Sequence, residues 1–161
     1  MKSLYDFIVT PYKSRYDNVR KIGDKTLIIN TTIENHRFVS KEAVVVSVPA
    51  AYSSPIKVGD KVHVHHNLFR RWYDQKGRER NSARYFKEDF YFCGPDQLYM
   101  YDNKSHLDYC FIKPISNSSY LHTRKEQPNE GIVHTCPKNK NIKVGDRVIF
   151  KPDSEFEFLI N

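Results

Sequence analysis

The chain has 161 residues, of which 39% are hydrophobic and 28% are charged, a balance typical of a soluble folded protein. It carries no apolar run of membrane-spanning length and no N-terminal signal peptide, so a cytoplasmic location is expected. The formal charge of +7 is compatible with nucleic acid as a partner, but charge alone does not select one. The 3 cysteines are widely spaced, which argues against a disulfide framework or a zinc ribbon.

Amino-acid usage favours strands, because 11 Tyr and 10 Phe occur with many Val and Ile and with only 6 Gly. In chain order, the first expected strand is residues 6–11, which ends at a proline. A long polar segment, residues 12–41, follows and exceeds the usual length of a connection in a compact domain. Residues 42–48 form the next expected strand. The sequence therefore predicts an all-β fold.

An internal repeat comes next, because residues 56–62, IKVGDKV, recur as residues 142–148, IKVGDRV. Gly accepts the positive φ of a tight turn, and Asp can hydrogen-bond the backbone of that turn. Each copy therefore predicts a strand that begins at a Gly-Asp turn.

The strands before this motif recur in the same order. Residues 130–134 take the place of residues 42–48, and the first strand, with its final proline, recurs as residues 108–114. Residues 1–103 and 104–161 are therefore expected to be tandem copies of one β-rich unit.

Two further features complete this organisation. Residues 70–84 are a charged insertion with a turn at Lys76-Gly77, and residues 90–101 are expected to close the first unit as a final hairpin. In the second unit, residues 155–160 alternate as a strand, but no closing hairpin follows them. The second copy is therefore expected to be incomplete, with a sheet edge left to be covered.

The order of these segments resembles the chaperonin-10 (GroES-type) co-chaperonin family, which has an opening D-x-x-I-V-like strand, a long mobile loop, a V-K-V-G-D-x-V strand and a final hairpin. The corresponding segments are residues 5–9, 12–41, 57–62 and 89–100. The resemblance implies a small GroES-like β-barrel, duplicated in tandem. The segment of residues 49–55 is shorter than the roof hairpin of bacterial members. In this respect the chain resembles virus-encoded (phage) members of the family.

The resemblance also implies a function. Members of the family cap a chaperonin (GroEL-type) ring and assist ATP-dependent protein folding, and they bind the ring through an aliphatic triplet in the mobile loop. Leu27, Ile28 and Ile29 are similar to this triplet and are the expected chaperonin-binding residues. Their β propensity also allows a buried strand of the barrel, but the length of the segment favours docking.

A homo-oligomer is a further implication of the resemblance. Family members form heptameric rings through the first strand of one subunit and the last strand of its neighbour. In this chain these strands carry the expected interface residues. Alternatively, the second unit of the same chain could cover these strand edges. The interface residues are Tyr5, Phe7, Val9, Leu98 and Met100.

An enzyme is not expected, and neither is a cofactor. The sequence has no dinucleotide-binding Gly-x-Gly-x-x-Gly motif, no nucleophile elbow and no His-Glu-x-x-His. The spacing of His63 and His65 places both imidazoles on one strand face, where they could share a metal. No Cys or carboxylate supports them, so a solvated strand face is the favoured interpretation and no metal site is predicted.

Nucleic acid is the alternative partner, bound by a small barrel of the OB type. The charged insertion interleaves cations with aromatic side chains, a composition that binds single strands on barrel surfaces. Asp74 and Glu79 dilute its charge, and cation–π contacts in a hydrophilic hairpin explain the same composition. The residues concerned are Arg70, Arg71, Trp72, Tyr73, Arg78, Arg80, Arg84 and Tyr85.

Overall fold

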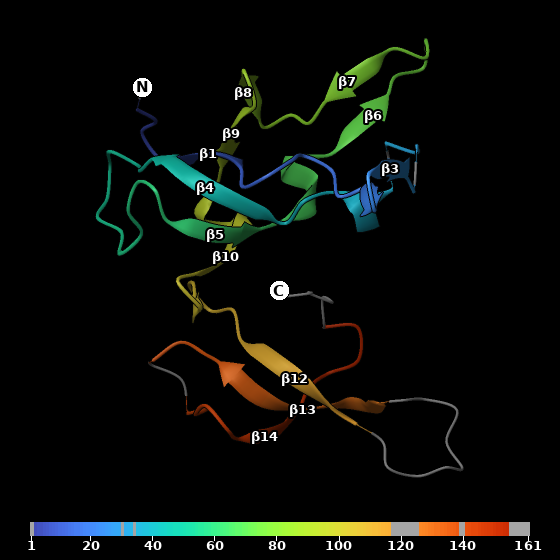
Figure 1. Cartoon of the computed structure of the whole chain (residues 1–161). Coiled ribbons are helices and arrows are strands. Elements are labelled where there is room, and N and C mark those ends of the chain that lie inside the picture. Colours follow the sequence, from blue (N-terminus) through green and yellow to red (C-terminus); the bar gives the residue numbers. More distant parts are fainter. Residues whose placement is uncertain (1, 30, 34, 117–125, 139–140, 155–161) are drawn as a thin grey trace. The chain divides into compact units, whose positions relative to one another are not determined.

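A computed structural model describes residues 2–29, 31–33, 35–116, 126–138 and 141–154. These residues form antiparallel β-sheets with short 3-10 helices and no α-helix among them, so the described chain is all-β. The chain is divided into two compact units, Met1–Asp102 (unit 1) and Asn103–Asn161 (unit 2) (Figure 1). In the described part, no helix has the length and apolar character needed to cross a membrane.

Unit 1 is built on an antiparallel sheet whose strands follow the order β10-β5-β4-β1-β9-β8. Two separate hairpins, β2–β3 and β6–β7, accompany it. The strands are β1 (Phe7–Pro11), β2 (Val19–Ile22), β3 (Lys25–Ile28), β4 (Glu42–Ser47), β5 (Lys61–Val64), β6 (Arg71–Tyr73), β7 (Glu79–Asn81), β8 (Tyr85–Lys87), β9 (Phe90–Cys93) and β10 (Leu98–Tyr101). The 3-10 helices are η1 (His36–Phe38), η2 (His66–Leu68) and η3 (Pro95–Gln97).

The core of unit 1 is formed by side chains that alternate along its strands. In β4, Ala43, Val45 and Ser47 are buried while the residues between them are partly exposed, which is the period of two that a strand imposes. Phe69 packs edge-on against Tyr91 of β9, with 4.9 Å between the ring centroids. Burial of each large apolar side chain stabilises the fold by roughly 1.5–3 kcal/mol. Other fully buried residues are Phe7, Val9, Val62, Val64, Leu68 and Leu98.

The closing strands of unit 1 do not form the expected final hairpin. β9 pairs with β1 and β8, whereas β10 pairs with β5. The hairpin prediction is wrong because β1 and β5 each present an edge that pairs with one of these strands. The turn at Gly94-Pro95 is therefore part of a connection, through η3, between two distant positions in the sheet order.

Unit 2 contains a three-stranded antiparallel sheet in the order β12-β13-β14. The strands of this sheet are β12 (Phe111–Ser116), β13 (Glu126–Thr135) and β14 (Arg147–Ile149), and the short strand β11 (Lys104–Ser105) precedes them. Val133 is buried, and Gly131 faces β12 so closely that a Cβ atom would lie 2.1 Å from Cγ2 of Ile112. The strand expected at residues 155–160 lies outside the described residues.

The sheet of unit 2 has the same strand order and register as part of unit 1, with β12, β13 and β14 in the places of β1, β4 and β5. Pro11 lies opposite Ala43, and Pro114 lies opposite Gly131. In both pairs the register shifts between the third and the second residue before the proline. Other equivalent pairs are Val44 with Lys61, and Ile132 with Arg147.

The Gly-Asp turn predicted from the repeat is confirmed in both units, with the same hydrogen bonds. In unit 1 the amide of Gly59 donates to a carbonyl of β4 at 2.8 Å, and the carboxylate of Asp60 accepts from the amide of Lys57 at 2.7 Å. In unit 2, Gly145 and Asp146 form the same two bonds, at 2.9 and 2.8 Å. Both glycines have a φ of +93°, a conformation that Gly adopts without steric penalty.

Candidate functional site

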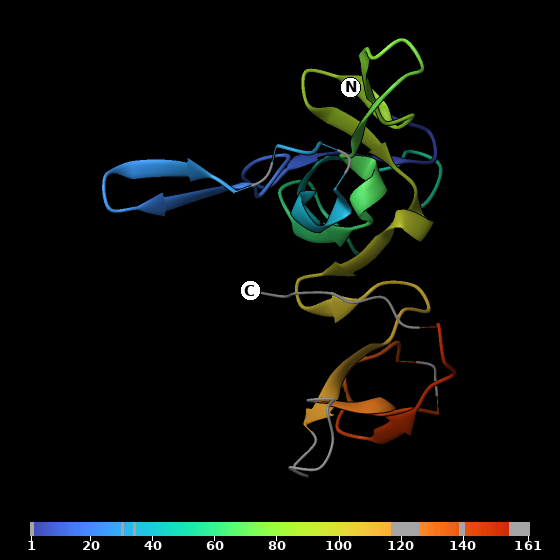
Figure 2. The same ribbon diagram turned by 90° about the vertical axis from the view of Figure 1, so that its right-hand side faces the viewer.

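The segment between β1 and β4 forms a β-hairpin arm, defined here as residues 18–29. β2 and β3 pair from Val19, opposite Ile28, up to a two-residue turn. Gly23 is the first residue of this turn and has a φ of +60°, as the first position of a type II′ hairpin turn requires. Figure 2 shows the arm, in blue, extending away from the main sheet of unit 1.

Apolar side chains are exposed on both faces of the arm. Cross-strand partners share a face and successive residues alternate, so Val19 and Ile28 lie on one face. Ile22, Leu27 and Ile29 lie on the other. The exposed fractions are 43% for Val19, 65% for Ile22, 52% for Leu27, 61% for Ile28 and 37% for Ile29. Such a concentration of exposed apolar surface is typical of an interaction site.

The base of the arm is anchored to unit 1 through Tyr16, which is buried. Its phenolic hydroxyl donates to the carbonyl of Ile33 at 2.7 Å and accepts from the amide of Arg71 at 2.8 Å. The Arg71 guanidinium also lies 4.8 Å from the centre of the ring. Beside it, the amide of Asp17 donates to the carbonyl of Phe38 at 2.7 Å, which joins the two ends of the loop. The arm therefore projects from a fixed base.

These observations bear on the expected docking triplet. Leu27, Ile28 and Ile29 are exposed, and β3 pairs with β2 alone, so the buried-strand interpretation is wrong. The triplet lies in a paired hairpin rather than in an extended loop, and its binding to a chaperonin stays a prediction. Sequence reasoning missed Val19 and Ile22 as parts of this surface. The signal was present, because apolar residues flank a Gly-Asp pair at hairpin spacing.

The expected subunit-interface residues lie in two different environments. Phe7, Val9, Leu98 and Met100 have buried side chains, whereas Tyr5 is exposed. β1 pairs with β4 on one side and β9 on the other, so within one chain it has no edge left for a neighbouring subunit. An interface through β1 would require strand exchange, and the interface assignment stays a prediction.

Three histidine rings cluster beside the base of the arm. The ring of His66 in η2 lies 5.4 Å from that of His36 in η1 and stacks on that of His65 at 4.4 Å between centroids. Burial, with nearby positive charge, lowers the pKa of His66 to about 4. β5 ends before His65, whose Nδ1 accepts an amide hydrogen bond that caps η2, while His63 is buried in the strand. Within the described ranges no three or more His, Cys, Asp or Glu side chains are placed so that together they could hold a metal ion, and this includes the three histidines.

The charged insertion forms the β6–β7 hairpin, with the expected turn at its tip, and several of its cations are paired with its own carboxylates. Asp74 forms ion pairs with Arg78 at 3.0 Å and with Arg80 at 3.1 Å. Arg71 pairs with Glu79 at 2.8 Å. Hydrogen bonds from the Arg78 amide and from the guanidinium groups of Arg80 and Arg78 lower the pKa of the Asp74 carboxyl. This pairing reduces the charge that the hairpin offers to phosphates.

Comparison with protein-family models, with curated proteins and with solved structures gave no significant match for this chain. The resemblance to the co-chaperonin family therefore rests on the segments quoted for it. Those segments, the arm, and the matched strands and turns of the two units are the features of this chain that point to a function.

Proposed function

We propose that the chain is a protein-docking module and, within that class, a co-chaperonin. Its arm would bind a GroEL-type chaperonin ring in a nucleotide-dependent manner, cap the folding chamber and assist ATP-dependent folding without chemistry of its own. The observation that carries the proposal is the arm, which has exposed apolar side chains on both faces and projects from an anchored base. In the co-chaperonin family the corresponding triplet docks between two helices of the chaperonin.

The fold proposed for this function is a small GroES-like barrel, duplicated in tandem. The support comes from the equal strand order, register and Gly-Asp turn of the two units. A change of one residue in register would turn every side chain to the opposite face, so equal register in both units also means that equivalent side chains point to the same face of the sheet.

The binding energy of a single arm is small. About half of the surface of Leu27, Ile28 and Ile29 is still accessible, so covering it contributes roughly 1 kcal/mol for each side chain. The loss of translational and rotational freedom on association exceeds this sum. Several arms that bind one ring together recover affinity through avidity, so a homo-oligomer, heptameric by resemblance, is part of the proposal.

Native mass spectrometry of the full chain with a GroEL-type ring, with ATP or ADP and without nucleotide, tests the proposal. Ile28→Asp places a charge on the arm, and Val58→Asp is the matched control because both side chains are apolar and 61% exposed. We expect a nucleotide-dependent complex with the wild type and with Val58→Asp. The complex should weaken at least tenfold with Ile28→Asp, while circular dichroism shows that all three chains are folded.

The opposite results have distinct meanings. A folded wild-type chain that forms no nucleotide-dependent complex would overturn the co-chaperonin assignment. A complex that survives Ile28→Asp would show that docking does not use the arm. The spectrum of the chain alone gives the subunit number in the same experiment.

A further inference from the structure

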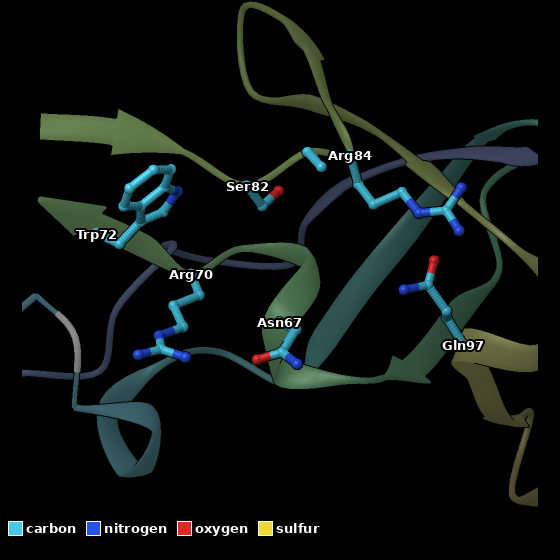
Figure 3. A pocket seen from close by; sticks show the side chains of 7 residues that line it. Asn67, Arg70, Trp72, Ser82, Arg84 and Gln97 are labelled. Atoms are coloured by element: carbon cyan, nitrogen blue, oxygen red, sulfur yellow. The ribbon is translucent and has the colours of Figure 1, made fainter. Parts of the chain in front are cut away.

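An open pocket with a volume of about 570 Å³ lies in unit 1 beside the β6–β7 hairpin (Figure 3). Its walls come from η2, from the residues around β6, from the segment between β7 and β8, and from η3. The side chains that matter for its chemistry are two guanidiniums, one indole, two carboxamides and a hydroxyl. They belong to Arg70, Arg84, Trp72, Asn67, Gln97 and Ser82.

The two guanidiniums differ from the paired cations of the hairpin. Nε of Arg70 is buried without a hydrogen-bond partner, and no ion pair to a carboxylate is found for Arg70 among the described residues. Arg84 has a carboxylate neighbour, Asp6, but at 3.8 Å the contact is long for a direct hydrogen bond. Arg70 as a whole is only partly buried, so its terminal guanidinium nitrogens, rather than Nε, are suited to an acceptor supplied by a ligand.

The aromatic wall of the pocket is Trp72. The indole is 44% exposed, and its Nε1 donates to the carbonyl of Asn81 at 3.2 Å, which fixes the plane of the ring. Figure 3 shows Trp72 and Arg70 at one end of the pocket and Arg84 with Gln97 at the other. A fixed and accessible indole beside a guanidinium group that has no ion pair is the combination that binds a planar base together with its phosphate.

We propose that this pocket binds a nucleotide unit, either as a free nucleotide or within a single strand of nucleic acid. The base stacks on Trp72, and Arg70 binds the phosphate that is attached to it. Arg84, at the other end, binds a second phosphate when the ligand is a strand. Asn67, which lies between the two ends in Figure 3, offers a donor and an acceptor group to the edge of the base. The site does not involve the arm, so it is independent of the co-chaperonin proposal.

Trp72 is the only tryptophan of the chain, so its fluorescence reports directly on the pocket. The full chain is titrated at about 0.15 M salt with thymidine monophosphate and with an oligothymidylate of about ten nucleotides. We expect saturable quenching. Tighter binding of the oligomer identifies a strand as the ligand, and equal affinity identifies the free nucleotide.

Three variants make the test specific. Arg70→Gln should weaken binding tenfold or more. Arg78→Gln removes the same charge from the hairpin, outside the pocket, and should change the affinity less than twofold. Arg84→Gln serves as the second pocket variant if circular dichroism shows that Arg70→Gln is unfolded. It should weaken the binding of the oligothymidylate. No saturable quenching by either probe, or quenching that both pocket variants leave unchanged, overturns the proposal.

Discussion

Acidification is expected to destabilise unit 1 through His66. Its ring lies against His65 and His36, and Lys41 and Arg70 add positive charge nearby. Burial, followed by these charges, lowers the pKa of His66 from 6.5 to about 4. The ring is therefore neutral in the folded chain but takes up a proton in the unfolded chain at mildly acidic pH. Its contribution to stability is complete above about pH 6.5 and is lost as the pH falls towards 4.

The magnitude of this loss follows from the two pKa values. A difference between 6.5 and about 4 corresponds to at most about 3.4 kcal/mol. The His66 ring is partly exposed, and screening by solvent reduces this to about 1–2 kcal/mol. Somewhat more than half of the contribution is lost by about pH 5, so we expect His66 alone to lower the free energy of unfolding by roughly 1 kcal/mol at that pH.

Urea unfolding of the full chain at about pH 7.5 and about pH 5, followed by circular dichroism, measures the effect. His66→Gln has no titrating ring at this position and should lose about 1 kcal/mol less than the wild type on acidification. His134→Gln is the control, because His134 is an exposed residue of unit 2 and its replacement should leave the wild-type loss unchanged. Equal losses for the wild type and His66→Gln would refute the reasoning.

Two further predictions concern stability. Tyr16→Phe removes the hydroxyl that joins Ile33 to Arg71, and urea unfolding should show a loss of about 1–2 kcal/mol; a loss below about 0.5 kcal/mol would contradict the anchoring role. Gly59→Ala and Gly145→Ala each place a methyl group where no atom lies within 4 Å, so the penalty is purely conformational, about 1–2 kcal/mol in either unit. Thermal unfolding of both variants checks this, and clearly unequal penalties would contradict the common geometry of the turns.

Local signals in the sequence were sufficient for several strands, among them β1 and β4, and for the repeated turn. The Gly-Asp pair at Gly59 needs only a positive φ and a carboxylate beside the backbone, so it is visible in a few residues. The pairing of β9 and β10 was not visible, because alternation shows that a strand exists but not which edge it joins. The anchoring role of Tyr16 was missed because its hydrogen-bond partners are 17 and 55 positions away in the chain.

The long segment between β1 and β4 shows the same limit for the candidate site. Its length suggested a loop, and its apolar residues suggested either a docking element or a core strand. The choice depends on whether β3 reaches the main sheet, which is a matter of tertiary pairing. In the structure β3 pairs only with β2, and this pairing leaves Leu27 and Ile28 exposed.

An arm with apolar side chains on opposite faces constrains the shape of whatever binds it. A flat surface covers Val19 and Ile28, or it covers Leu27 with Ile22, but it cannot cover both sets at once. A partner that shields both needs a slot with two walls. For walls made of β-sheet, packed layers lie about 10 Å apart, so the two walls stand about 20 Å from each other, backbone to backbone. The width of the slot would then decide which partners can hold the arm, whatever side chains line the slot.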